Sequence, residues 1–364
     1  MGIQASAEKS IPSDPTSSQY FCLPVVTNNY CTTRLNMADM QFMDLQLTPR
    51  FYPYGVRLDG RFVIKKKVSA WLDSTVYVAH DTQIGMDCVV YVISTADNGH
   101  RANAHAQFLA SSKNVEGFPK MLHQFSMGSY ENIVTTLHGE DMFAVLARSV
   151  FHISKQNAIR FAHRLFTLIS KIHDLGYVHR NIRTNTVRGG LDWQADFILQ
   201  IDNFFYTAPI APQPSSSRMG SWATQSLQVN LGEPYTQIDD YVAGLFVVME
   251  SQGIRPFLPL VVNRQDMIGA KMEFDEDPEA FIQKEEMHWI VELYEELKLQ
   301  RMEGLNLDKI WSILNSAEPN FNPSSKIQWE FVSKESCVVQ LTGDETKIEG
   351  SSSNPPKKPI TVPQ

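Results

Sequence analysis

Short runs that contain many apolar residues form the first patterned part of the chain. They are 61–68 (RFVIKKKV), 74–81 (STVYVAHD) and 87–94 (DCVVYVIS), each rich in β-branched residues and bounded by polar turns. Such runs are typical of β-strands, and their close succession predicts an antiparallel sheet. We expect a further strand at 130–137 (YENIVTTL), preceded by a short helix at 103–113 (NAHAQFLASSK).

After His138 the apolar residues recur at helical spacing. The clearest case is the segment 154–176, which Ser154 can cap and which Gly176 can end in the left-handed conformation. A second helix is expected at 236–253, where Thr236 and Asp239 have the spacing of a capping box.

Two more helices are expected toward the C-terminal end of the patterned region. One spans 277–299, with Asp277 as its cap and Pro278 in its first turn, and the other spans 306–317. The acidic stretch from Glu273 to Glu279 is interpreted as a solvated helix start, where the helix dipole favours negative charge. The alternative is that it attracts a basic partner.

The order of these elements predicts an α+β fold with two lobes. A flexible N-terminal arm (1–55) would precede a small, antiparallel β-rich N-lobe (56–136). A larger, mainly α-helical C-lobe (137–332) would follow, and a disordered tail (333–364) rich in Ser, Pro and Lys would end the sequence. A ligand site is expected in the cleft between the lobes.

Composition excludes several classes of function. The net charge is -8 and the longest basic run is three lysines, which argues against a general nucleic-acid-binding protein. Four separated cysteines without C-x-x-C spacing predict reduced thiols in a protein of the cytoplasm or nucleus. No apolar run reaches the length of about 18 residues that a membrane span needs. The opening MGIQAS matches the myristoylation pattern at Gly2, so membrane attachment is expected only if that glycine is acylated.

Several motifs in order resemble one enzyme family. The stretch 177–187 (YVHRNIRTNTV) resembles the catalytic loop of protein kinases, and 201–205 (IDNFF) resembles their metal-binding D-F-G motif. The motifs FPKMLHQF, TLHG, SKIHDLGYVHR, GSWATQS, IDDY and IQWE are similar to those of the casein kinase I group, including its tau-tubulin kinase branch. The resemblance covers 61–330, and it implies a bilobal protein kinase-like fold.

In the family, glycines cover the nucleotide phosphates and a strand lysine pairs with them. Here Ser69, Trp71 and Ser74 stand where the glycines would be, and Trp71 would fill the space. The lysine position falls at Tyr91, or at Val92 if the alignment slips by one residue. Neither side chain is basic, so the grip on the phosphates is lost.

Other positions of the nucleotide site have changed as well. The glutamate that would hold the lysine aligns near His105, and Thr135 and Leu137 are expected to line the degenerate nucleotide cleft. Both partners of the family's lysine–glutamate ion pair are therefore absent at the aligned positions.

The catalytic loop has lost its base. Asn181 occupies the position of the catalytic aspartate, and an amide cannot accept the substrate proton. Arg183 replaces the loop lysine and keeps a cation there, while Thr186 replaces the asparagine that holds the second magnesium ion. Asn185 is one position too early to take that role.

One metal ligand of the family is kept. Asp202 matches the aspartate of D-F-G, although Asn203 and Phe204 follow it, and a single carboxylate is a poor magnesium site. Its alternative role is to stabilise the loop. Asp240 matches the buried aspartate that braces the catalytic loop in the family, beside the retained His179 and Arg180.

These residues lead to three hypotheses. The first is a catalytically inactive casein kinase I-like pseudokinase that acts as a signalling scaffold or allosteric partner, with no cofactor. Its partners would be proteins, such as an active kinase or that kinase's substrates, and not nucleic acids. The second is a weak serine/threonine kinase that uses ATP and magnesium through Asp202 and Arg183. The third is a membrane-tethered adaptor acylated at Gly2.

Overall fold

The computed structural model describes residues 52–70, 74–148, 153–191, 197–211, 223–257, 264–319, 321–322, 325 and 327. All of them belong to one of two compact units of the chain, Thr48–Gln364. The predicted arm up to residue 51, the predicted tail, Gly2 and Trp71 lie outside the described residues.

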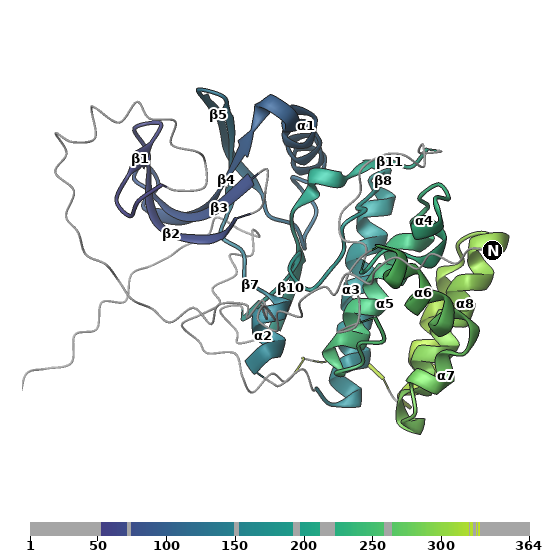
Figure 1. Cartoon of the computed structure of the whole chain (residues 1–364). Coiled ribbons are helices and arrows are strands. Elements are labelled where there is room, and N and C mark those ends of the chain that lie inside the picture. Colours follow the sequence, from purple (N-terminus) through teal and green to yellow (C-terminus); the bar gives the residue numbers. More distant parts are fainter. Residues whose placement is uncertain are drawn as a thin grey trace, which may run out of the picture. The chain divides into compact units, whose positions relative to one another are not determined.

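A curled antiparallel sheet forms the first part of this unit (Figure 1). Its strands run in the order β1-β2-β3-β4-β6-β5, and every neighbouring pair is antiparallel. Their bounds are β1 Arg57–Leu58, β2 Phe62–Ala70, β3 Ser74–Asp81, β4 Met86–Ser94, β5 Met121–Met127 and β6 Tyr130–Thr136. The strands expected from the β-branched runs are confirmed, whereas β5 was not predicted, because its MLHQFSM sequence has no β-branched residue.

The central strand β4 buries both of its faces. Cys88, Val90 and Val92 point into a cluster enclosed by the curl of the sheet, while Val89, Tyr91 and Ile93 point into the main core. The α1 helix (Thr95–Ser111) packs against β4 and β6. It starts earlier than expected, and the non-helical backbone of Asn98 marks the kink between its two parts.

Helices dominate the rest of the described chain. They are α2 Met142–Arg148, α3 Lys155–Asp174, α4 Leu227–Leu231, α5 Gln237–Ser251, α6 Arg264–Glu276, α7 Pro278–Phe281, α8 His288–Glu303 and α9 Leu307–Ala317, with short 3-10 turns η1 Phe204–Tyr206 and η2 Glu285–Met287. Three short β elements, β7 Glu140–Asp141, β9 Val187–Leu191 and β10 Phe197–Ile201, form a second sheet. The pair β8 Tyr177–Val178 and β11 Ala208–Pro209 forms a third.

The caps predicted for α3 and α5 are confirmed. Ser154 accepts a hydrogen bond from the backbone N–H of Asn157, and Gly176 takes a left-handed φ of 86° after the helix. Thr236 and Asp239 form the capping box of α5. Local sequence therefore sets both ends of the first helix and the start of the second.

The predicted helix 277–299 is wrong as a single element. Asp277 caps α7 as expected, but the chain leaves the helix after Phe281 and resumes it in η2 and α8. The interruption allows Ile282 to turn inward, where it is 1% exposed. The acids Glu273 and Glu276 lie in the last turn of α6, so only the end of the acidic stretch is a helix start.

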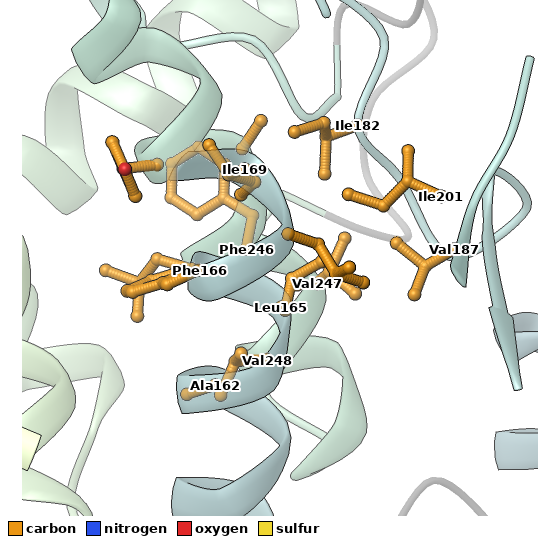
Figure 2. Close-up of a cluster of buried hydrophobic side chains, with 14 of the residues drawn as sticks. Ala162, Leu165, Phe166, Ile169, Ile182, Val187, Ile201, Phe246, Val247 and Val248 are labelled. Atoms are coloured by element: carbon orange, nitrogen blue, oxygen red, sulfur yellow. The ribbon is translucent and has the colours of Figure 1, made fainter. Parts of the chain in front are cut away.

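The main core lies where α3 crosses α5 (Figure 2). Leu165, Phe166 and Ile169 of α3 pack against Val247 of α5 within one cluster of buried residues. The two helices approach closely at Gly244, since a Cβ atom there would lie 2.9 Å from Ile169 and 3.0 Å from Phe166.

Asp240, near the start of α5, holds the backbone of the 177–187 loop. Its carboxylate accepts hydrogen bonds from the backbone N–H groups of His179 (2.7 Å) and Arg180 (3.0 Å) and from the Tyr235 hydroxyl (2.7 Å), and it lies 3.0 Å from Nε2 of His173. The expectation that Asp240 braces this loop is confirmed. Arg180 takes a left-handed φ of 67°, so the brace also fixes a strained turn.

Asp240→Asn is expected to destabilise the protein. The amide that replaces one carboxylate oxygen cannot accept a hydrogen bond, so at least one buried donor loses its acceptor, which costs about 1–3 kcal/mol per donor. The free energy of unfolding from urea denaturation measures this loss. Asp174→Asn, an exposed site at the end of α3, is the matched control and should change it by less than about 0.5 kcal/mol.

Candidate functional site

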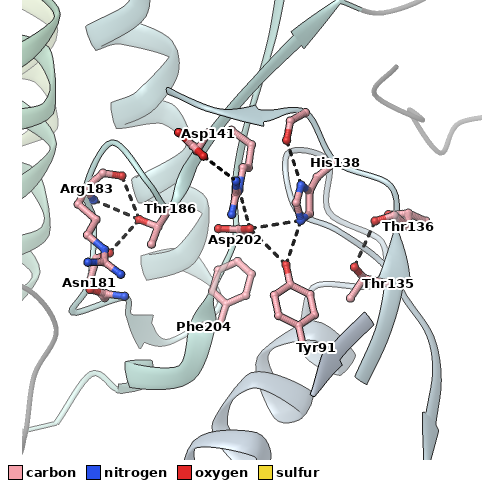
Figure 3. A network of polar contacts seen from close by, with 12 residues as sticks. Tyr91, Thr135, Thr136, His138, Asp141, Asn181, Arg183, Thr186, Asp202 and Phe204 are labelled. Atoms are coloured by element: carbon pink, nitrogen blue, oxygen red, sulfur yellow. Dashed lines mark hydrogen bonds and ion pairs between the residues drawn. The ribbon is translucent and has the colours of Figure 1, made fainter. Parts of the chain in front are cut away.

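Asp202 is the centre of the candidate site. It follows β10, is fully buried, and its Oδ2 atom accepts a 2.7 Å hydrogen bond from Nε of Arg188 on β9 (Figure 3). Antiparallel pairing of Gln200 with Arg188 brings the two side chains together. The carboxylate that matches the family's metal ligand is thus already paired with a cation of the same chain.

Burial alone would lower the pKa of Arg188, but the Asp202 carboxylate beside it outweighs burial and the pKa is raised. The guanidinium therefore stays charged and neutralises the carboxylate. It also lies 3.7 Å from Asp141, whose other oxygen accepts the Ala144 N–H at the start of α2. Arg188 joins the β9–β10 hairpin to the β7–α2 segment through these two acids.

Tyr91 contacts the same carboxylate from the six-stranded sheet. Its hydroxyl donates to Oδ2 of Asp202 over 3.2 Å and lies 3.2 Å from Nε2 of His138. Because side chains alternate along β4, Val92 points to the opposite face. Of the two positions considered from the sequence, Tyr91 is therefore the one that faces Asp202.

The phenol stays neutral in this position. Burial, and then the Asp202 charge, raise the pKa of Tyr91 well above its usual value of 10.0. It acts as a hydrogen-bond donor, and the positive charge near Asp202 comes from Arg188 on a different strand.

Two buried histidines complete the surroundings. His138 donates from Nδ1 to the Gly139 carbonyl (3.0 Å), and burial together with the nearby Arg188 charge lowers its pKa to about 4. His105 on α1 accepts the Phe204 N–H (3.1 Å), and burial lowers its pKa to about 3. Both imidazoles are neutral at pH 7, so His105 meets Tyr91 as a ring contact, with centroids 4.7 Å apart, and not as an ion pair.

The 181–186 loop is closed on itself. Thr186 donates its hydroxyl to the Asn181 carbonyl (2.8 Å) and accepts the Arg183 N–H (3.1 Å). Its oxygen is engaged within the loop and is not directed to Asp202 as a second metal ligand would be. The amide group of Asn181 is buried without a hydrogen-bond partner in the described part of the chain, and Arg183 is mostly buried, which lowers its pKa.

His179 links this loop to Asp202 by structural hydrogen bonds. Its Nε2 atom donates to the Asp202 carbonyl (3.1 Å) and its Nδ1 atom accepts the Asn181 N–H (3.2 Å). Asn203 takes a left-handed φ of 61°, and the Phe204 ring that follows stacks on Phe108 of α1 with centroids 3.9 Å apart. Both nitrogens of His179 are thus engaged in hydrogen bonds to the backbone.

The other predicted cleft residues lie on the sheet or just beyond it. Ser69 on β2 pairs with Val76, which pairs with Tyr91, so Ser69 is two strands away from Tyr91. Thr135 on β6 is fully buried and donates to the Thr136 carbonyl. Leu137 packs against the main core.

Sequence reasoning missed Arg188, His138 and Asp141. Arg188 lies in the short run TVRGG, which contains no acid to mark it as part of a buried pair. Gly139 was noticed only as part of a motif. A Cβ atom there would lie 2.2 Å from the Gly189 carbonyl oxygen, so a glycine is needed for the two backbones to touch.

Searches for groups of three or more metal-ligating side chains, and for helices able to cross a membrane, found neither among the described residues. The chain matches no protein-family model and no curated protein. The resemblance to protein kinases therefore rests on the sequence motifs alone.

The Arg188–Asp202 pair gives a testable stability pattern. Arg188→Met leaves a buried carboxylate without its cation, and Asp202→Leu leaves a buried guanidinium with only the distant Asp141. Each change is expected to lower the free energy of unfolding by about 3–5 kcal/mol. The double variant should lose clearly less than the sum, measured by urea denaturation; additive losses would show that the two side chains do not interact.

The two neutral histidines predict acid sensitivity. An unfolded imidazole has a pKa of about 6.5 and takes up a proton between pH 7 and 5, whereas folded His138 and His105 do not. Unfolding is thus favoured as the pH falls, by about 2 kcal/mol for each residue between pH 7 and 5. In His105→Asn, the free energy of unfolding from urea denaturation should fall less steeply between pH 7 and 5 than in the wild type. His100→Asn, an exposed position on the same helix, is the matched control and should keep the wild-type slope.

Proposed function

We propose that this chain is a casein kinase I-like pseudokinase that acts by binding protein partners and not by transferring phosphate. The observation that carries the proposal is the Arg188–Asp202 contact of 2.7 Å. The proposal takes the six-stranded sheet as the small lobe and the helical part as the large lobe, and the hydrogen bond from Tyr91 on β4 to Asp202 would join the two. The motif order and the braced 177–187 loop support the same arrangement.

Magnesium with ATP does not fit the residues present. A magnesium ion needs oxygen ligands that are free to approach it, together with phosphates held by cations. Oδ2 of Asp202 is engaged by Arg188 and Tyr91, and the Thr186 hydroxyl is engaged within its loop. A second cation beside Arg188 would be repelled by it, which disfavours a metal at this carboxylate.

The losses at Tyr91 and Asn181 act in the same direction. A neutral phenol cannot balance phosphate charge, and an amide cannot accept the proton of a substrate hydroxyl. The hydrogen bonds that remain hold the fold: Asp240 to the loop, His179 to Asp202, and Tyr91 to Asp202. Residues of a former reaction centre would then serve as a rigid support for binding surfaces.

A weak kinase is the second candidate, and one observation favours it. Oδ1 of Asp202 has no hydrogen-bond partner among the described residues, so one oxygen remains for a ligand. Charge neutralisation by Arg188 is nevertheless the stronger effect, because the guanidinium is buried beside the carboxylate at 6% exposure.

Nucleotide binding separates the two candidates. A ligand at 100 times its Kd would stabilise the folded state by about 2.7 kcal/mol, which raises the Tm of a domain of this size by several degrees. We expect no rise in Tm when ATP is added to the purified protein with magnesium or manganese.

Phosphotransfer to general acidic and basic protein substrates should likewise be undetectable. Turnover by the wild-type protein that disappears in Asp202→Asn, with both assayed well below the Tm of that variant, would establish the kinase instead. Arg188→Lys is a useful companion, since it keeps the cation and should be as inactive as the wild type.

A further inference from the structure

The α8 helix borders a cavity of about 560 Å³ on the helical part of the chain. Its walls come from α7, η2 and α8, from Lys155 at the start of α3, and from the end of α9. This volume falls in the usual range of ligand pockets, about 300–1,000 Å³. No residue of the Asp202 site lines the cavity, so what it binds is independent of the proposed pseudokinase function.

The lining is strongly acidic. The cavity is lined by a single lysine, Lys155, and by five glutamates: Glu279, Glu285, Glu286, Glu292 and Glu295. Of these five glutamates, only Glu295 has an ion-pair partner within the described ranges, namely Lys298 at 3.2 Å. Repulsion between the remaining carboxylates would be relieved by a positively charged ligand.

Helix electrostatics explains only part of this charge. Glu285 and Glu286 precede the first turn of α8, where the helix dipole favours acids. Glu292 and Glu295 lie one to two turns further along and are three residues apart on the same helix, an arrangement in which like charges destabilise a helix. The charge in the cavity therefore exceeds what the helix start accounts for.

Trp289 provides a second, independent indication of a ligand. It lines the cavity at 5% exposure, and its indole N–H has no hydrogen-bond acceptor in the described part of the chain. Buried polar groups in folded proteins nearly always have a partner. The nitrogen is shielded from solvent, so a ligand that offers a carbonyl oxygen would supply the acceptor after a small rotation of the ring.

We propose that this cavity binds a basic peptide segment of a partner protein. Lysine or arginine side chains would meet the glutamates, and a backbone carbonyl would accept the hydrogen bond from Trp289. A single metal ion does not meet both requirements, and no group of three or more acidic or histidine side chains close enough to hold one was found in the described ranges. Phosphate-rich ligands are excluded because the carboxylates would repel them.

The peptide Gly-Arg-Arg-Gly-Arg-Arg-Gly with a fluorescent label is the probe, and its fluorescence anisotropy is measured with the full chain at about 0.1 M salt, where screening still permits short-range contacts. We expect saturable binding, and no binding of the same peptide with glutamine in place of arginine. Glu286→Gln/Glu292→Gln should weaken binding at least tenfold. Trp289→Phe, which keeps the ring and removes the donor, should weaken it several-fold.

The matched control is Glu273→Gln/Glu276→Gln, which removes the same charge from exposed positions on α6. It should bind like the wild type. An equal loss in this control, or no binding by the wild-type chain, would overturn the proposal. Unchanged far-UV circular dichroism and Tm in each variant show that the effect is not one of folding.

A segment of this chain could compete for the same cavity. Lys357 and Lys358 are the basic pair in its last residues. If Lys357→Gln/Lys358→Gln strengthened peptide binding, the occupant would be in the same chain and the partner-protein proposal would fail. We expect the affinity of that variant to equal that of the wild type.

Discussion

The buried contact between Arg188 and Asp202 is the interaction on which the centre of this protein depends. A carboxylate in the interior is tolerated only when a cation and hydrogen bonds compensate for its lost hydration. Here Arg188 supplies the cation and Tyr91 supplies a hydrogen bond. Three strands meet at this charge, because Tyr91 lies on β4, Arg188 lies on β9 and Asp202 directly follows β10.

Much of the fold was predictable because its signals are local. The α3 and α5 helices are specified by apolar spacing and by capping side chains a few residues apart, and β3 and β4 by runs rich in β-branched residues. The break after Phe281 was not predictable in this way. Its cause is the inward turn of Ile282, which depends on a core built by distant segments.

The candidate site was likewise predictable only where its signals are local in the sequence. Tyr91 and Asn181 could be singled out from the sequence, because each stands at a defined spacing in a motif that resembles those of protein kinases. The partner of Asp202 could not be recognised, since the pairing register of β9 with β10 decides which side chain reaches the carboxylate. Nothing in the short run TVRGG specifies that register by itself.

The shared contact of Tyr91 and Arg188 with one carboxylate has a mechanical consequence. Tyr91 belongs to the six-stranded sheet, whereas Arg188 and Asp202 belong to the segments beside the helices. A hinge motion of the sheet away from the helices would break the hydrogen bond from the buried Tyr91 hydroxyl to the charged, buried Asp202 carboxylate. The close backbone contact of Gly139 with Gly189 would resist a sliding motion nearby. Enzymes that admit and release a substrate on each turnover need such opening to be easy. Contacts that resist opening instead favour a single stable conformation of the sheet and the helices.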